Sequence, residues 1–438
     1  MRTSFLIFYN KLITLVCKLF GKKASVFPGS LVLPFDRNVL DKIKYPKYVI
    51  GVTGSSGKGT TVALIAHILK ENGLEVIWNE SGSNAINATT TIVLNNTKIL
   101  SHQMKCDVLL LEIDEIHLKE TSILTHLIVT NVTRDQVARN STPEMVLNKI
   151  KEGINDQMHL IINADDPLVM RLAIDFKGKI TTYGIAETEY SRKKPISNNI
   201  DAAYCPICSK KLKYDYYHYG HLGNYHCPEC DFKRKTDYET TNIDLDNAKI
   251  MINKETIHLN KNAFFNIYST TAAYTLTNEM GINKEAILKA LNINILPSKR
   301  LKTLKFGERD INMLESKNEN NLSYYQSLDF INNYPDKKTV ILGFDNVSRR
   351  YSYNDISWLY DVDFEHLDTK NIDYIYCIGK FKYDVYTRLV HAGINEKQLI
   401  LVDEIKNIKS LLNKSKGTIF TMVCFDMTEI LKKVLLGD

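Results

Sequence analysis

The sequence predicts an α/β protein with a larger central domain, which carries an inserted four-cysteine module, and a smaller α/β domain after it. Apolar, β-branched runs alternate with helical patterns on both sides of residue 300, which indicates mostly parallel sheets. A glycine-rich loop follows the first run, and two Cys-x2-Cys pairs interrupt the alternation near residues 201–240. The length of 438 residues suits two or three domains, and 44% hydrophobic with 24% charged residues is typical of a soluble globular chain.

The charge balance is mild, since 56 basic and 50 acidic side chains give a net charge of +6. So small an excess gives no reason to expect a nucleic-acid partner. Four of the eight cysteines cluster in two pairs, and the others are scattered through apolar runs. This distribution is not that of a disulfide framework and is typical of a reducing compartment, so we expect a cytoplasmic protein.

Residues 1–45 are expected to form an N-terminal helical segment with an apolar run over 5–20. Asn10 and Lys11 interrupt that run, so neither half reaches the ~20 apolar residues of a membrane-spanning helix. One interpretation is a helix that packs on its own protein, which we favour. The other is an amphipathic helix in peripheral contact with a membrane, with these lysines near its polar side: Lys11, Lys18, Lys22 and Lys23.

The central domain is expected over 46–300, and its first strand, at 47–53, leads into the glycine-rich loop. Glycines let backbone N–H groups converge on an anion, and the following helix adds its unpaired N–H groups and its dipole. Lys58 can reach the terminal phosphates of a nucleotide, and the hydroxyl of Thr60 can hold Mg²⁺. The residues expected to bind the nucleotide here are Gly54, Gly57, Lys58, Gly59, Thr60 and Thr61.

This loop departs from a strict Walker A motif. Val52 stands five positions before Gly57 where glycine is usual, and Gly59 separates Lys58 from the first threonine. A tight turn before an amphipathic helix is the alternative interpretation. The order of strand, loop and helix favours phosphate binding.

Polar side chains also follow the next strands of this domain. One apolar run ends at Glu112, which is placed to bind the Mg²⁺ of a nucleotide at the carboxyl edge of a parallel sheet. Asp114 and Glu115 fit solvated helix-cap residues equally well. The strand ends at 129–136 and 162–167 belong either to the same site or to plain helix N-caps.

The two cysteine pairs predict a structural zinc site. Cys205 and Cys208 form one Cys-x2-Cys pair, Cys227 and Cys230 form the other, and eighteen residues separate the pairs. Four thiolates complete a tetrahedral Zn²⁺ shell and leave no open position for catalysis. We therefore expect a zinc ribbon inserted at about 201–238. A redox iron site and a ribbon that stacks single-stranded nucleic acid are the weaker alternatives.

Residues 301–438 are expected to form the smaller domain. A helical pattern at 266–280 and a boundary at 297–300 precede it. Four apolar runs, most of them followed by helical patterns, predict its strands at 339–345, 373–379, 398–403 and 418–425.

Taken together, these motifs resemble one known family. The phosphate loop and the polar strand ends are similar to the central domain of Mur ligases. The four-cysteine insertion, with the tyrosine-rich stretches 214–216 and 225–227, and the Ser-Trp-Leu-Tyr-Asp-Val-Asp-Phe stretch at 357–364 are more specific. The whole chain resembles the MurT-type subunits of lipid II isoglutaminyl synthase. The resemblance implies a Mur ligase-like P-loop central domain with an inserted zinc ribbon and a Rossmann-like C-terminal α/β domain.

The resemblance also implies an activity, which is ATP-dependent amidation of the D-glutamate α-carboxylate in the lipid II stem peptide, at the inner face of the membrane. The implied cofactors are ATP, Mg²⁺ and structural Zn²⁺, and the implied partner is a GatD-like glutamine amidotransferase subunit. In that family an aspartate before Ser-Trp is linked to amidation, and Asp355 matches it. The implied site residues are Asp355, Lys58 and Glu112 for catalysis, Thr60 and Glu112 for Mg²⁺, and Gly57, Asn84, Asn131 and Asp166 for nucleotide or substrate.

A partner is also expected because the chain shows no convincing glutaminase nucleophile. The four cysteines outside the pairs lie in apolar segments, where a buried and inert thiol is the default, and they are Cys17, Cys106, Cys377 and Cys424. Ammonia must then come from elsewhere.

Two other functions stay open. Gly59 makes the loop similar to that of folylpolyglutamate synthases, which favours a ligase that joins an amino acid to a carboxylate. Divergent stretches near residues 318 and 350 favour a non-catalytic paralogue that acts as a zinc-ribbon scaffold.

Overall fold

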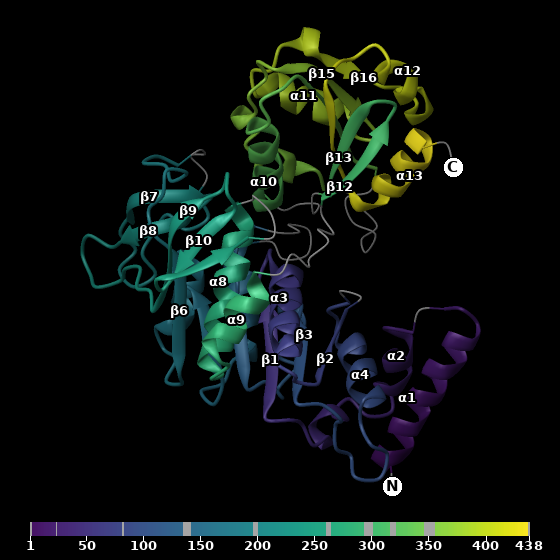
Figure 1. Cartoon of the computed structure of the whole chain (residues 1–438), viewed down its shortest axis with the longest axis vertical. Helices are drawn as coiled ribbons and strands as arrows, with labels where there is room; N and C mark the ends of the chain where they lie inside the picture. Colours follow the sequence, from purple (N-terminus) through teal and green to yellow (C-terminus); the bar gives the residue numbers. More distant parts are fainter. Residues whose placement is uncertain are drawn as a thin grey trace. The chain divides into compact units, whose positions relative to one another are not determined.

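A computed structural model describes most of the chain (Figure 1). It describes residues 2–22, 24–80, 83–134, 142–195, 200–259, 264–292, 301–315, 321–345 and 355–436. The expected boundary at 297–300 and the divergent stretches near 318 and 350 lie outside these ranges. The chain divides into two compact units. Unit 1 comprises Met1–Val132, Glu144–Lys193 and Ala202–Leu296, and unit 2 comprises Thr133–Pro143, Lys194–Asp201 and Pro297–Asp438.

Unit 1 is built on a nine-stranded sheet with the order β11-β10-β9-β6-β5-β4-β1-β3-β2. The strands from β9 to β2 in this order pair in parallel, and β9, β10 and β11 pair antiparallel at the other edge. The central strands are apolar and buried on both faces, as parallel strands between helices are. The bounds are β1 Tyr48–Thr53, β2 Val76–Trp78, β3 Val108–Glu112, β4 His126–Val129, β5 His159–Asn163, β6 Ile180–Ile185, β9 Tyr238–Asp244, β10 Lys249–Ile252 and β11 Glu255–His258.

Helices cover this sheet, and α3 packs on α8 and α9 in front of it (Figure 1). The apolar residues of α3 recur at helical spacing and are buried: Val62, Ile65, Ala66 and Leu69. The helices of unit 1 are α1 Arg2–Leu19, α2 Phe27–Val32, α3 Lys58–Glu71, α4 Ile86–Asn95, α6 Pro143–Gly153, α7 Pro167–Met170, α8 Phe264–Glu279 and α9 Lys284–Leu291.

The N-terminal helix α1 packs on α2 and α4 through one face, where Leu6 and Ile7 are buried. One face of the segment therefore packs on its own protein, as the favoured interpretation expects. Among the described residues, none of the helices has both the length and the apolar character that crossing a membrane requires.

Four parallel strands end at one edge of the unit 1 sheet and place their loops together. Val52 near the end of β1 pairs with Glu112 at the end of β3. On the other side, Thr53 pairs with Val129 of β4, which in turn pairs with Ile162 of β5. The loops after β1, β3, β4 and β5 therefore start side by side, as expected for a ligand site in an open α/β sheet.

The four-cysteine module is an insertion between β6 and β9. Its hairpin consists of β7 (Lys213–Tyr219) and β8 (Leu222–His226), which pair antiparallel. A small core of buried side chains holds the module together: Cys205, Leu212, Tyr225, Cys227 and Phe232.

Unit 2 contains a six-stranded sheet with the order β12-β13-β17-β14-β15-β16, in which only the β12–β13 pair is antiparallel. Trp358 is 1% exposed and lies 5.1 Å from Tyr324 and 5.2 Å from Phe344 between ring centres. The bounds are β12 Leu301–Phe306, β13 Arg309–Glu315, β14 Lys338–Gly343, β15 Ile372–Ile378, β16 Leu399–Leu401, β17 Thr418–Val423, α10 Asn321–Asn332, α11 Lys382–His391, α12 Ile408–Leu412 and α13 Phe425–Leu436.

Candidate functional site

The phosphate loop joins β1 to α3, and two glycines shape its turns. Gly54 has a φ of +123°, and Gly57, the N-cap of α3, has a φ of +83°. L side chains rarely adopt such values, and a Cβ on Gly54 would stand 2.3 Å from Thr130 Oγ1. The loop therefore requires glycine at these positions. The first N–H groups of α3 have no intrahelical partner and are available to an anion.

Asn131, just after β4, braces this loop from the neighbouring strand. Its Oδ1 accepts hydrogen bonds from Ser56 N (3.1 Å) and Ser56 Oγ (3.2 Å), and its Nδ2 donates to the Ser56 carbonyl at 3.1 Å. The Thr130 hydroxyl donates to the same carbonyl at 2.7 Å. Asn131 thus maintains the shape of the loop, and its contact with a nucleotide stays a prediction.

Lys58 is buried at the start of α3. Its Nζ donates to the Gly54 carbonyl and forms an ion pair with Glu115 Oε1 at 2.9 Å. Burial lowers the pKa of the ammonium, but the charges of Glu115, Asp114 and Glu112 outweigh burial and raise the pKa on balance. The charged form therefore persists at neutral pH. Its contribution to stability is present below the unfolded-state pKa and is lost as the pH rises through the folded-state pKa.

Asp114 and Glu115 are not solvated, and the structure corrects that expectation. Asp114 is 7% exposed and Glu115 is 4% exposed. Asp114 does cap a short 3-10 helix, Glu115–His117, where its carboxylate accepts a hydrogen bond from Ile116 N at 3.3 Å. Glu115 instead faces inward, because it is the ion-pair partner of Lys58.

Glu112 ends β3 beside the first turn of α3. A Cβ on Gly59 would stand 3.2 Å from Glu112 Oε2, so the carboxylate lies against the residue that follows Lys58. Asn79 fixes the backbone of Glu112, because its Oδ1 accepts from Glu112 N at 2.8 Å and its Nδ2 donates to the Glu112 carbonyl at 3.0 Å. A carboxylate oxygen held at this point fits Mg²⁺, which prefers hard oxygen ligands shared with phosphates.

The two threonines after Gly59 differ in their surroundings. Thr60 is half-buried on the first turn of α3. Thr61 is buried, and its hydroxyl donates to the Gly57 carbonyl at 3.0 Å. Thr60 is therefore the better placed of the two hydroxyls for a metal ligand, and both nucleotide contacts stay predictions.

Asp166 joins three segments at the end of β5. It is the N-cap of α7, where its Oδ1 accepts from Leu168 N at 2.8 Å and from Val169 N at 3.3 Å. Its Oδ2 accepts from Val132 N, in the loop after β4, at 2.8 Å. His221, in the turn between β7 and β8, donates from Nε2 to Asp166 Oδ1 at 3.1 Å. The helix-cap alternative is confirmed, and a nucleotide contact by Asp166 stays a prediction.

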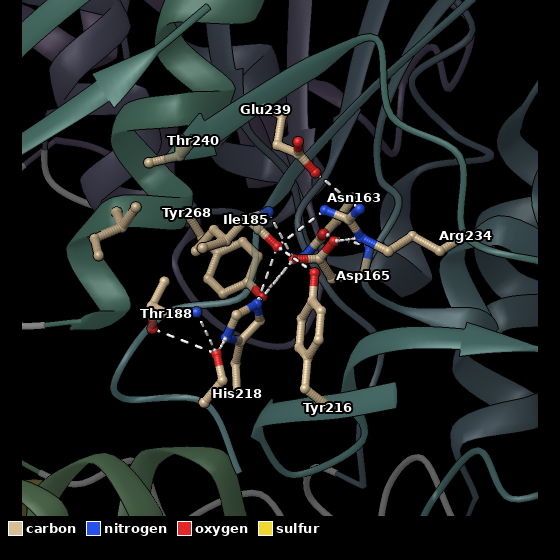
Figure 2. A network of polar contacts seen from close by, with 12 residues as sticks. Asn163, Asp165, Ile185, Thr188, Tyr216, His218, Arg234, Glu239, Thr240 and Tyr268 are labelled. Atoms are coloured by element: carbon tan, nitrogen blue, oxygen red, sulfur yellow. Dashed lines mark hydrogen bonds and ion pairs between the residues drawn. The ribbon is translucent and has the colours of Figure 1, made fainter. Parts of the chain in front are cut away.

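Asp165 anchors the other end of the four-cysteine module (Figure 2). Its Oδ1 accepts from Arg234 Nε at 2.6 Å, just beyond the last cysteine, and its Oδ2 accepts from Tyr268 OH at 2.7 Å and from Ile185 N at 2.8 Å. Burial lowers the pKa of His218, whose Nε2 donates to the Ile185 carbonyl at 3.1 Å. Two consecutive acids after β5 thus attach the module to the sheet.

The four predicted cysteine ligands form one cluster. Their sulfur atoms all lie within 4.8 Å of one another, with Cys205 and Cys230 Sγ 3.5 Å apart and Cys208 and Cys227 Sγ 3.3 Å apart. Tetrahedral bonds of about 2.3 Å to a Zn²⁺ would place the sulfurs ~3.8 Å apart. The spacing therefore fits a four-thiolate metal site.

Asp355 and Asn84 lie outside the helices and strands. Asp355 Oδ1 accepts a hydrogen bond from Ser357 N at 2.9 Å, ahead of the 3-10 helix Ser357–Tyr360 in unit 2. The Asn84 carbonyl accepts from Asp114 N at 3.1 Å, next to the end of β3. The roles of both side chains in catalysis or binding stay predictions.

Two of the cysteines outside the module, Cys106 and Cys377, have thiols whose pKa is raised, which makes them poor nucleophiles. Cys377 and Cys424 are buried. Burial raises the pKa of Cys377 to about 12, and burial with nearby acids raises that of Cys106 to about 11. This agrees with ammonia from another protein.

Removal of the His221 side chain is expected to destabilise unit 1. In His221→Ala the buried carboxylate of Asp166 loses one of its donors, which costs about 1–3 kcal/mol of unfolding free energy. His226→Ala is the matched control in the same module, because His226 is half-exposed and 3.9 Å from the exposed Asp215. Its cost is expected to stay within about 0.5 kcal/mol. Urea unfolding measures both, and equal costs would contradict an anchoring role of His221.

Comparison with known proteins agrees with this geometry. The profile of the Mur ligase middle domain matches residues 52–226, and the profile of the MurT ligase C-terminal domain matches residues 317–425. Pseudomurein peptide ligase type C from Methanothermus fervidus has the same fold, with a TM-score of 0.69 at 20% identity over 91% of this chain and 80% of that chain. MurF from Acinetobacter baumannii has a TM-score of 0.67 at 15% identity over 93% and 80%.

Two curated relatives extend over nearly the whole chain. The MurT subunit of the glutamine-hydrolyzing lipid II isoglutaminyl synthase from Staphylococcus aureus strain N315 is 30% identical over 94% of this chain and 92% of its own length. The MurT subunit from Streptococcus pneumoniae strain R6 is 27% identical over 89% and 86%. The chain therefore belongs to the MurT family of Mur ligase-type subunits.

Proposed function

We propose that the chain is the ATP-dependent ligase subunit of a lipid II isoglutaminyl synthase. It would convert the α-carboxylate of D-glutamate in the lipid II stem peptide to an amide. The observation that carries the proposal is the glycine-shaped phosphate loop, with the Glu112 carboxylate against Gly59 and the buried Lys58 beside it in the sequence, in a chain of the MurT family. The reaction takes place in the cytoplasm, at the inner face of the membrane that holds the lipid-linked substrate.

Activation of the carboxylate is the chemical task. A carboxylate does not react with ammonia at neutral pH, because its negative charge repels a nucleophile and oxide is a poor leaving group. Transfer of the γ-phosphoryl group to the carboxylate gives an acyl phosphate and ADP. Ammonia then forms the C–N bond, and inorganic phosphate leaves.

The residues of unit 1 would serve the first step. The N–H groups of the loop and the Lys58 ammonium bind phosphate oxygens and stabilise the charge that develops on them. Glu112 and Thr60 are the residues that would hold Mg²⁺, which would supply positive charge to offset that of the phosphates. Asn131 keeps the loop in shape through Ser56.

The second step needs a group that orients ammonia or takes its proton, and we assign this to Asp355. Ammonia would come from a GatD-like glutamine amidotransferase subunit, since burial raises the pKa of Cys106 and Cys377, two of the four thiols outside the four-cysteine module. The four-cysteine cluster would hold a structural Zn²⁺, because four thiolates close its coordination shell.

The product distinguishes this function from its alternatives. The chain is combined with a GatD-like glutamine amidotransferase from the same organism, Mg·ATP, glutamine and lipid II. Mass spectrometry of the stem peptide is expected to show a hydroxyl replaced by an amino group, with glutamine consumed. A gain of an amino-acid residue would instead select the ligase favoured by Gly59, and the absence of any ATP turnover would select the scaffold.

Asp355→Asn is expected to lower the kcat of amidation by about 10²–10⁴-fold while the enzyme keeps its affinity for ATP. Asp368→Asn is the matched control, because Asp368 also accepts a hydrogen bond from the N–H two residues further on, Lys370 N at 3.0 Å. The Oδ1 of asparagine can still accept this hydrogen bond, so both variants lose only the negative charge of the carboxylate. Equal kcat values for them would remove Asp355 from the chemistry.

A further inference from the structure

The N-terminal helix α1 has two faces of different character, and its rotation is fixed by polar contacts. On the packed face, Asn10 Nδ2 donates to the Thr91 carbonyl at 3.2 Å and to Asn95 Oδ1 at 2.9 Å. Thr14 Oγ1 donates to the same Asn95 oxygen at 3.1 Å. These bonds to α4 determine which side of α1 faces away from unit 1.

The opposite face of α1 is apolar and exposed. Its side chains recur at intervals of three and four residues, so they form one stripe along the helix. Their exposed fractions are Phe5 61%, Phe8 50%, Leu12 44%, Leu15 55%, Val16 43%, Leu19 76% and Phe20 76%. Scattered exposed leucines need no explanation, but a continuous stripe of large apolar side chains marks a surface that another phase or molecule covers.

The charged side chains of the segment that carries this stripe, residues 1–35, all have one sign. Residues 1–35 contain no aspartate or glutamate, although acidic and basic residues are nearly balanced over the whole chain. Lys18 and Lys22 are exposed at the end of the stripe. The nearest acid in sequence, Asp36, forms an ion pair with Lys42. An apolar face with lysines at its end and no acid in its own segment matches the interface of a bilayer that contains anionic lipids.

A second copy of the chain fits this surface less well. A two-fold contact through α1 would bring two sets of basic residues together, with no acid in the segment to offset them. An anionic lipid surface removes that repulsion and buries the same apolar side chains.

We propose that the exposed face of α1 is a membrane-docking surface. The helix lies parallel to an anionic bilayer, with the stripe in the boundary between headgroups and acyl chains and the lysines at the headgroups. The helix does not span the bilayer, in keeping with its interruption by Asn10 and Lys11. The argument rests on α1 alone and does not depend on the proposed reaction.

Vesicle sedimentation of the full chain tests the proposal, with neither nucleotide nor precursor present. The chain is expected to bind vesicles of phosphatidylglycerol and phosphatidylethanolamine and to be released by high salt or by replacement with phosphatidylcholine. Leu15→Ser with Leu19→Ser is expected to weaken binding at least about tenfold. Lys18→Glu with Lys22→Glu is expected to weaken it by at least about fivefold per lysine.

The matched control is Leu100→Ser with Ile174→Ser, which removes two exposed apolar side chains of unit 1 outside α1, 90% and 44% exposed. It is expected to bind as the wild type does, and circular dichroism confirms that each variant is folded. Absence of vesicle binding by the wild type, or equal binding by the α1 variant, would overturn the proposal. The proposal would also be overturned if the wild type formed a dimer that Leu15→Ser with Leu19→Ser abolishes. Loss of vesicle binding in the complex with the glutaminase subunit would overturn it as well. Because no substrate is present, these outcomes are independent of the amidation assay.

Discussion

Replacement of Lys58 by alanine is expected to lower glutamine-dependent amidation by at least about 10²–10³-fold, because the loop loses a charged donor to the transferred phosphoryl group. The side chain is 6% exposed and sits at the start of α3. Its ammonium is the cation that the sequence predicted there. Rates of amide formation at saturating ATP measure the effect.

The same change also breaks a buried ion pair, so stability must be separated from chemistry. Loss of Lys58 alone leaves the carboxylate of Glu115 buried without its cation, which costs about 3–5 kcal/mol. Lys58→Met with Glu115→Gln removes both charges and is expected to regain most of that stability without regaining activity. Lys70→Met is the control on the same helix, since its side chain is 45% exposed. An active double variant would contradict the role of Lys58.

Loss of the metal that the four-cysteine cluster is proposed to hold is expected to have the second largest effect. In Cys205→Ser the shell lacks one thiolate, and the small core that contains Cys227 and Tyr225 loses its support. Binding free energies of about 10–16 kcal/mol for structural Zn²⁺ in small modules show how much stability depends on such an ion. We expect the module to unfold at a much lower urea concentration than the wild type requires.

The consequence should extend to the phosphate loop. His221 attaches the module to Asp166, and Arg234 attaches it to Asp165. Asp166 also accepts a hydrogen bond from Val132 N, and Val132 directly follows Asn131, which braces the phosphate loop. Metal content and ATP affinity should therefore fall together in Cys205→Ser. Cys106→Ser, which lies outside the module, should change neither. If the metal-free protein kept wild-type stability and ATP affinity, the module would not support the phosphate loop.

Local patterns predicted the parts of the site that local physics determines. The apolar run at 47–53 corresponds to β1, because a short β-branched run bounded by turns is a buried strand in a covered parallel sheet. The spacing of the cysteines predicted their cluster, since each pair needs only one tight turn. The helix cap at Asp166 followed from the preference of aspartate before a helix start.

Contacts between distant residues could not be predicted from one sequence. Lys58 and Glu115 are separated by 57 residues, and Asp166 and His221 by 55. Nothing local to Glu115 distinguishes a buried partner from a solvated cap, which is why the sequence left both interpretations open and only the structure excluded the solvated one. The support of the Glu112 backbone by Asn79 likewise depends on how β2 and β3 pair. The antiparallel extension β9 to β11 is short and partly polar, so its pattern was too weak to indicate strands.

The central claim is that the loop around Gly57 presents ATP to a carboxylate and makes an acyl phosphate. The most direct test labels the α-carboxylate of D-glutamate in the precursor with heavy oxygen and follows the label during amidation. The account predicts that one labelled oxygen appears in inorganic phosphate for each amide formed, with ADP as the other product. Label that stays out of phosphate, or a reaction that releases AMP and pyrophosphate, would contradict it.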